Sequence, residues 1–271
     1  MTSPIIGAAL TNAELATYQS WILEKDRDLE LQSFVGGAVL DDDWTPLAEE
    51  VKRLLVGYKG RMGIHGPFWG FTIDTPDPLV RAVVQKRLGQ GLDVCAAVGG
   101  THMVVHSPFT TWDYNNLDGY TGARDRMLTS VHDVMAPIVK RAETLGVTLV
   151  LENIEDINPA DRKELCQSFG STAFQVSIDT GHAHYAHGST GAPPVDYFVR
   201  SAGDMLAHVH LQDADGYADR HWQIGQGNIL WPSVFAAIAA LSVKPRLILE
   251  LADKDCIPAS MAYLEAQGLG Q

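Results

Sequence analysis

The chain is poor in cysteine, with three in 271 residues. Cys95, Cys166 and Cys256 lie far apart in the sequence and form no C-x-x-C pair. An odd number of widely separated cysteines argues against a disulfide framework. The sequence therefore predicts buried free thiols and a reducing compartment.

Positive charge and long apolar runs are also scarce. There are 20 Lys and Arg against 33 Asp and Glu, which gives a formal net charge of −13. Proteins that bind phosphate backbones usually carry a basic face, so this balance argues against nucleic acid and anionic membranes as partners. No run reaches the ~18 apolar residues of a membrane span. The segment Met1–Leu10 does not look like a targeting segment, so we expect a cytoplasmic protein.

Short apolar runs alternate with longer helical patterns about eight times along the chain. The runs are apolar nearly throughout, which is typical of parallel strands covered on both faces. Without a repeat, linker or composition break, this alternation predicts an α/β fold: one (β/α)8 TIM barrel domain over residues 1–271. The alternative, an open doubly wound sheet, lacks the expected G-x-G-x-x-G after its first strand. The predicted strands are Ile5–Leu10, Leu29–Phe34, Met62–Phe68, His102–Ser107, Thr148–Asn153, Phe174–Thr180, His208–Asp213 and Leu247–Leu251.

Helical patterns occupy several of the intervals between these strands. Asn12 and Asp77 are candidate N-caps, and Gly146 is a candidate C-cap. The helix between the sixth and seventh strands is expected to be short. The predicted helices are Asn12–Lys25, Pro78–Ala97, Arg124–Leu145, Val195–Ala202, Trp231–Leu241 and Pro258–Gln267.

Residues that could bind a metal lie at or near the C-terminal ends of most of the later predicted strands. In a (β/α)8 barrel the C-terminal strand ends converge on one mouth, so residues remote in sequence become neighbours there. A carboxylate that ends an apolar strand is costly unless its charge is compensated, and these motifs contain no Lys or Arg. Mixed imidazole and carboxylate ligands suit Zn, Mn or Co better than Ca. The strand-end residues are His65, His106, Glu152, Asp179, His182, His210 and Glu250.

The loop after the seventh strand adds Asp219 and His221, which can reach one ion from a turn, with Arg220 between them as a substrate contact. Any one of these residues alone is more often structural than functional. His208 shares a strand face with His210 but lies deeper, so we expect a structural role. His184 and His187 are expected in a solvated loop. Aromatic residues after the third and fourth strands form either a wall for a substrate ring or a hydrophobic cover over loops; they are Phe68, Trp69, Phe109 and Trp112.

Together these motifs resemble the xylose isomerase-like barrel superfamily, which contains endonuclease IV (AP endonuclease family 2) and sugar isomerases and epimerases. The resemblance covers about His65 to Glu250, and all nine candidate ligands match the endonuclease IV pattern by residue type. In the isomerases and epimerases the similar core is Glu152, Asp179, His210 and Glu250 around one metal. The motifs are HGPF, VVHSPF, LEN, SIDTGH, HVHLQD, DRHWQIGQGNI and LILEL.

Two departures from endonuclease IV bear on the activity. The loop from His210 to Asp219 looks shorter, and the segment after His65 reads Gly-Pro-Phe-Trp-Gly, unlike the DNA-inserting loop of the endonuclease. Together with the acidic charge, these departures disfavour DNA as the substrate.

The resemblance implies two competing activities. The first is isomerisation or epimerisation of a small sugar or sugar derivative through an enediolate, with Glu152 and Glu250 as acid and base and His182 and His210 holding substrate and metal. The second is phosphoester hydrolysis by a cluster of up to three ions, which Glu152 or Glu250 bridges. A non-catalytic metal-binding barrel is a third class. The sequence favours the isomerase or epimerase, with one to three divalent ions, and leaves a homo-oligomer open.

Overall fold

The strands of this protein pair in chain order and close on themselves, because β1 is parallel to β8 as well as to β2. The computed structural model describes residues 3–271, so residues 1–2 of the predicted domain lie outside it. The closed barrel confirms the predicted (β/α)8 TIM fold. Its strands are β1 Gly7–Leu10, β2 Leu29–Leu31, β3 Met62–His65, β4 His102–His106, β5 Thr148–Glu152, β6 Phe174–Asp179, β7 Leu206–Leu211 and β8 Arg246–Leu249.

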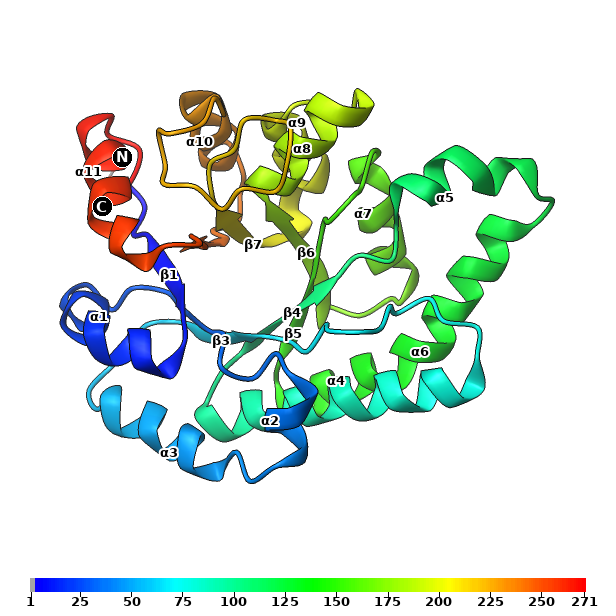
Figure 1. Ribbon diagram of the computed structural model, residues 1–271, viewed down its shortest axis with the longest axis horizontal. Coiled ribbons are helices and arrows are strands. Elements are labelled where there is room, and N and C mark those ends of the chain that lie inside the picture. The colour runs from blue at the N-terminus through cyan, green and yellow to red at the C-terminus, as the bar shows by residue number, and fades with distance from the viewer. Residues whose placement is uncertain (1–2) are drawn as a thin grey trace.

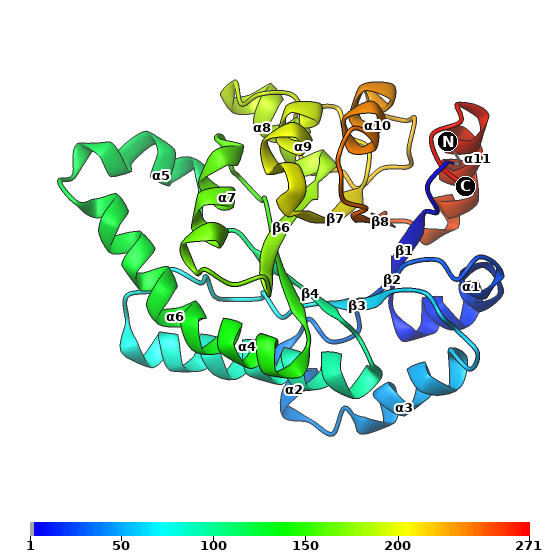
Figure 2. The ribbon, with the colours of Figure 1, turned by 180° about the vertical axis from the view of Figure 1, so that it is seen from behind.

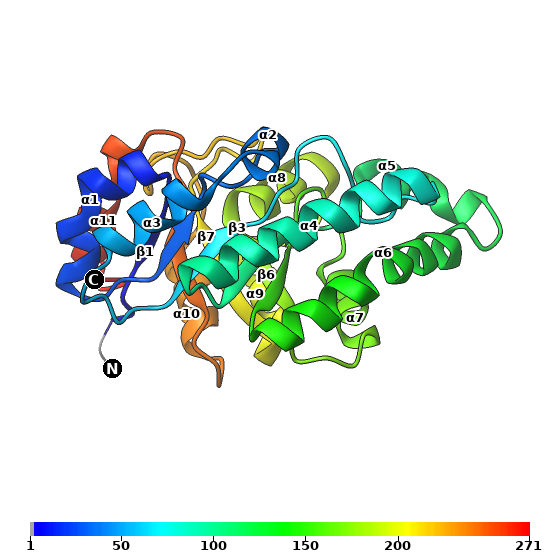
Figure 3. The ribbon, with the colours of Figure 1, turned by 90° about the horizontal axis from the view of Figure 1, so that it is seen from below.

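Helices surround the strands, and the view down the shortest axis shows them around the barrel (Figure 1). The two longest, α4 and α6, pack on each other along one side, and Figure 3 shows α5 beside their outer ends. The helices are α1 Asn12–Glu24, α2 Gly37–Asp41, α3 Thr45–Leu54, α4 Pro78–Val98, α5 Thr111–Asn116, α6 Ala123–Leu145, α7 Pro159–Ser168, α8 Thr180–Thr190, α9 Val195–Ala202, α10 Trp231–Ala239 and α11 Ile257–Ala266.

Local signals explain where several elements begin and end. Asp77 caps α4 through its side chain, and Gly146 ends α6 at a φ of 68°, both as predicted. The α1 cap is Thr11 rather than Asn12, because Thr11 and Glu14 form a capping box. The third strand stops at His65, short of the predicted Phe68. Pro67 lacks the N–H that a continued strand would need.

The connection from β6 to β7 contains two helices rather than the single short one that was predicted. Asp179 ends β6 and caps α8, since its side chain accepts a hydrogen bond of 2.7 Å from the His182 backbone N–H. The expected loop for His184 and His187 is therefore wrong, because both lie on α8. The sequence reading also named no helix at α2, α3, α5 or α7.

The two ends of the described chain lie side by side, next to α11 (Figure 2). Gln271 donates its backbone N–H to the Pro4 carbonyl at 2.9 Å, and Ile6 donates to the Gln271 carbonyl at 3.0 Å. Between residues 3 and 271, no helix is long and apolar enough to cross a membrane.

Candidate metal centre

Four side chains from consecutive strands meet inside the barrel mouth. Glu152 and Asp179 end β5 and β6, His210 lies near the end of β7, and Glu250 follows β8. One nitrogen or oxygen atom from each lies within 4.8 Å of the other three. Glu152 Oε1 and Glu250 Oε2 lie 2.9 and 3.2 Å from His210 Nδ1. We call these four residues the central cluster; they are the set that the sequence placed around one metal.

The other predicted ligands form two groups beside the central cluster. In the first of these groups, His65 and His106 lie around Glu152, which is also a member of the central cluster. The second group consists of His182, Asp219 and His221. His182 joins that second group to the central cluster, since its Nδ1 lies 3.7 Å from both Glu152 Oε1 and Asp179 Oδ1. The structure thus brings together all nine residues that the sequence singled out as ligands.

One oxygen of Glu152 shows why a cation fits this arrangement. Among the described residues 3–271, no group hydrogen-bonds to the buried Oε2. The Nε2 atoms of His65 and His106 each lie 3.7 Å from Oε2 and only 3.3 Å from each other. A buried carboxylate oxygen without a partner costs free energy. A divalent metal ion would satisfy the oxygen and both ring nitrogens at once, so the donor set fits such an ion.

Four of the five candidate ligand histidines, His106 being the exception, are held as metal ligands usually are, with one ring nitrogen hydrogen-bonded and the other facing the site. Nδ1 of His65, His182 and His221 each lies 2.9 Å from a backbone carbonyl, of Gly66, Asn153 and Glu250 respectively. His210 is turned the other way. Its Nε2 faces the Glu30 carboxylate at 3.0 and 3.1 Å and its Nδ1 faces the central cluster. These bonds fix the ring directions before any ion arrives.

The acids and imidazoles compete for protons in this buried space. Burial lowers the pKa of His106 to about 3 and raises the pKa of Asp179 to about 6. Burial also opposes charge on His210, but the carboxylates of Glu250, Glu30 and Glu152 outweigh it and hold the pKa of His210 well above its usual value. Burial would raise the pKa of Glu152, yet His210, His106 and His182 keep it below the usual value. Metal binding would release the protons held here, since ligands bind deprotonated.

The predicted substrate contacts fall in different environments. Phe68 packs on the site, with its ring centroid 4.8 and 4.4 Å from those of His65 and His106. Trp69 and Trp112 are 69% and 59% exposed, so both are free to meet a ligand from solvent. Arg220 instead binds Asp215, through Nε at 3.1 Å and Nη2 at 2.9 Å.

A pocket of about 170 Å³ opens beside His106, between the loops that follow β3, β4 and β5. Its walls are mostly apolar, and Glu155 is the only carboxylate among the described residues that line it. Among the residues that the structure describes, no Lys or Arg lines it. The lining residues are Pro67, Phe68, Phe71, Thr72, Ile73, Val105, His106, Ser107, Phe109, Thr110, Ile154 and Glu155.

Sequence reasoning missed several polar residues that shape the centre. Gln32 Nε2 donates to Glu250 Oε1 at 2.6 Å, and the Asn153 side chain bonds both the N–H and the carbonyl of Asp179. Glu30 lies inside β2, 2% exposed, against His210. A charged residue within the apolar run Leu29–Leu31 was a signal for Glu30, but attention to strand ends passed over it.

Comparison with known proteins gives one family. The model of the family described as "Xylose isomerase-like TIM barrel" matches residues 28–267. By sequence, the uncharacterised protein MJ1311 of Methanocaldococcus jannaschii is 24% identical over 180 residues, which are 64% of this chain. That match spans 58% of the length of MJ1311, less than two thirds of the relative.

Solved structures share the whole architecture. The TTHB071 protein of Thermus thermophilus, in a structure obtained with ZnCl2 soaking, is 25% identical, with a TM-score of 0.72 and 96% of each chain covered. A D-tagatose 3-epimerase-like protein is 20% identical, with a TM-score of 0.78 and 96% of each chain covered. At 20% identity, the second likeness supports the fold.

Proposed function

The chain belongs to the xylose isomerase-like TIM barrel family, and from this premise we propose that it is a divalent-metal-dependent isomerase or epimerase of a small sugar or sugar derivative. The observation that carries the proposal is the central cluster, in which two buried glutamates flank one imidazole. The name of the D-tagatose 3-epimerase-like protein, whose fold is similar, supports the same reaction class.

Glu152, Asp179, His210 and Glu250 would hold the ion, which we propose to be Zn, Mn or Co. When bound, such an ion supplies a Lewis acid that polarises a carbonyl group. The ZnCl2 soak named for the Thermus thermophilus protein supports zinc among these choices.

The two glutamates would move the proton. Glu250 Oε1 is held by Gln32 at 2.6 Å, which fixes the carboxylate for removing a proton from the carbon beside the carbonyl. Glu152 would return a proton from the other side of the resulting enediolate. His182 Nε2, 3.2 Å from Asp219 Oδ2, would orient a substrate hydroxyl. General acid–base groups of this kind typically contribute ~10²–10⁴ in rate.

The pocket beside His106 favours an unphosphorylated substrate. Its apolar walls, including the Phe68 ring, suit the carbon face of a sugar, and Glu155 suits hydroxyl groups. A phosphate would meet that carboxylate, and the described lining residues offer it no guanidinium or ammonium partner, so its burial there would cost free energy.

Phosphoester hydrolysis remains a second candidate because of one observation. The nine ligand residues fall into three adjoining groups, and Glu152 is shared by two of them. A shared carboxylate suits a site with more than one ion, and two ions can stabilise both the attacking and leaving oxygens of a displacement.

A substrate screen in D2O with elemental analysis separates the two candidates. We expect deuterium to enter one of a panel of ketoses and aldoses, and Glu250→Gln to lower this exchange by ~10²–10⁴. Glu164→Gln is the matched control, because Glu164 is an exposed residue of α7. If no sugar exchanges while bis(p-nitrophenyl) phosphate is hydrolysed by protein with two or three ions, the hydrolase takes the place of the isomerase.

A further inference from the structure

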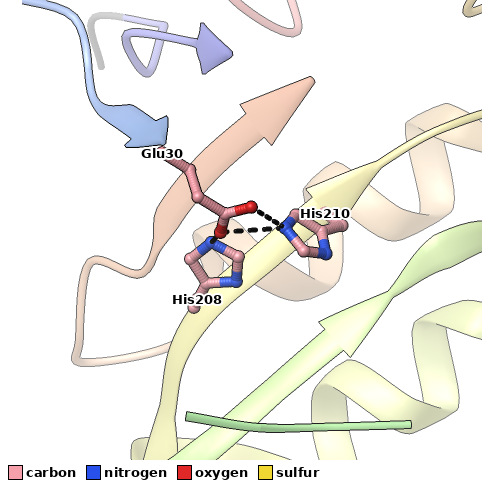
Figure 4. A group of neighbouring side chains, drawn as sticks. All are labelled: Glu30, His208 and His210. Carbon is pink, nitrogen blue, oxygen red and sulfur yellow. Dashed lines mark hydrogen bonds and ion pairs between the residues drawn. The ribbon is translucent and has the colours of Figure 1, made fainter. Parts of the chain in front are cut away.

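Behind the central cluster, His210 also belongs to another buried group, which contains one acid and two imidazoles. Glu30 reaches from β2 toward His208 and His210, which point from the same face of β7 (Figure 4). Their exposed fractions are 2%, 2% and 0%. No step of the proposed reaction uses Glu30, yet burying a carboxylate is costly unless it has a defined partner.

We propose that Glu30 is a positioning residue that sets the direction and the tautomer of His210. Both Glu30 oxygens lie near His210 Nε2, at 3.1 and 3.0 Å, so this nitrogen carries a proton and donates a hydrogen bond to the carboxylate. Nδ1 faces Glu152 and Glu250, and its lone pair would become available to a metal ion once the proton on Nδ1 is released. The inference rests on the proposed metal binding by the central cluster. A carboxylate behind a ligating imidazole fixes the ring and strengthens it as a ligand.

His208 keeps the Glu30 carboxylate in place. Its Nδ1 lies 2.8 Å from Ser177 Oγ on the neighbouring strand β6, which holds the ring. Its Nε2 lies 3.2 Å from Glu30 Oε2, and the two imidazole rings stand edge to face with centroids 4.6 Å apart. The chain of contacts Ser177–His208–Glu30–His210 therefore runs across the barrel interior from β6 to β7 and β2.

The three residues are already paired directly with one another, so we assign them no ion of their own. The Glu30 oxygens lie 3.0–3.2 Å from the two Nε2 atoms, which is the spacing of a direct hydrogen bond or ion pair. The space beside Glu30 and His208 leaves no room for even a water molecule. The group acts by holding His210 rather than by holding an ion.

Two substitutions of Glu30 test the inference. Glu30→Leu removes the acceptor, and we expect the affinity for Zn²⁺ and Co²⁺ to fall 10–100-fold, the usual effect of losing such an outer partner. Glu30→Gln keeps one oxygen that can accept from His210 Nε2, so a smaller loss of affinity is expected. Asp161→Asn is the matched control, since Asp161 is a buried carboxylate of α7 outside the central cluster and the two neighbouring groups.

Affinity is measured by chelator competition on the full chain, and the visible spectrum of the Co²⁺-loaded protein reports the ligand geometry. A weaker affinity and altered spectrum for Glu30→Leu, with an unchanged Asp161→Asn control, support the inference. If both Glu30 variants bind Co²⁺ as tightly as wild type and differ only in unfolding temperature, Glu30 is merely structural and the inference fails. If wild type itself binds neither ion, the proposed function fails with it, and that outcome is seen before any variant is made.

Discussion

Two sets of buried carboxylates in this protein are neutralised in different ways. Asp156 and Asp161 each meet a guanidinium, from Arg162 at 2.7 Å and Arg124 at 2.5 Å. Within the described chain, the acids of the central cluster have only imidazoles at ion-pair distance. A guanidinium stays charged and completes the first set as structure, whereas imidazoles can give up their protons and so leave the second set open to a divalent ion.

Removing the metal should have the largest effect. We expect a chelated and dialysed protein to lose sugar turnover, and to regain it when Zn, Mn or Co is added back. An ion present at 100 times its Kd stabilises the fold by ~2.7 kcal/mol, so the metal-free protein should also unfold more readily. Elemental analysis and urea unfolding check both effects. Full turnover by protein shown to be metal-free would contradict the claim that the acids of the central cluster serve to bind a metal ion.

Arg162→Leu should come next, with a loss of about 3–5 kcal/mol in the free energy of unfolding. The change leaves Asp156 buried without its partner, and it removes hydrogen bonds to the carbonyls of Leu151 and Ser177. Metal content should not change, because Arg162 touches none of the ligands.

The control for this variant is Arg200→Leu, which breaks the exposed pair with Asp196 and should cost less than about 1 kcal/mol. If urea unfolding shows the same loss of free energy for both variants, the buried Arg162–Asp156 pair stabilises the fold no more than the exposed pair does.

Asp179→Asn should abolish metal binding with little loss of stability, whereas Arg162→Leu should lower stability and leave metal binding unchanged. Burial already raises the pKa of Asp179 to about 6, so replacing the acid with an amide should change the free energy of unfolding of the metal-free protein by less than about 1 kcal/mol. Asn can still accept the hydrogen bond from the His182 backbone N–H. Metal binding, followed by titration calorimetry, should be lost. A metal-free Asp179→Asn protein as unstable as Arg162→Leu would mean that Asp179 is a structural acid.

The smallest expected effect is in binding to nucleic acid. With a net charge of −13, the protein should show negligible affinity for a labelled abasic duplex at physiological salt. Fluorescence anisotropy at two salt concentrations measures this. Tight binding that weakens steeply with salt would instead favour a hydrolase that acts on DNA.

The sequence predicted the barrel and the candidate ligands for a common reason. Apolar runs define the strands, and the closed topology carries their ends to one place, so His65 and Glu250 could be grouped without knowing any distance. Glu30 was missed because only the approach of β2 and β7 across the barrel interior reveals its partner. Arg220 was expected at the substrate but lies on Asp215, a pairing set by the path of the loop. The pattern for α8 was missed because its histidines and small residues hide the apolar face.

The central claim is that Glu152, Asp179, His210 and Glu250 bind a divalent metal, and anomalous scattering from crystals tests it most directly. Data collected at the absorption edge of the added metal should show a peak among these four side chains, with bonds of ~2.0–2.2 Å. Further peaks at the two neighbouring groups would indicate a multi-ion centre. The contradictory result is no peak in the central cluster, with His210 still paired directly to Glu152 and Glu250.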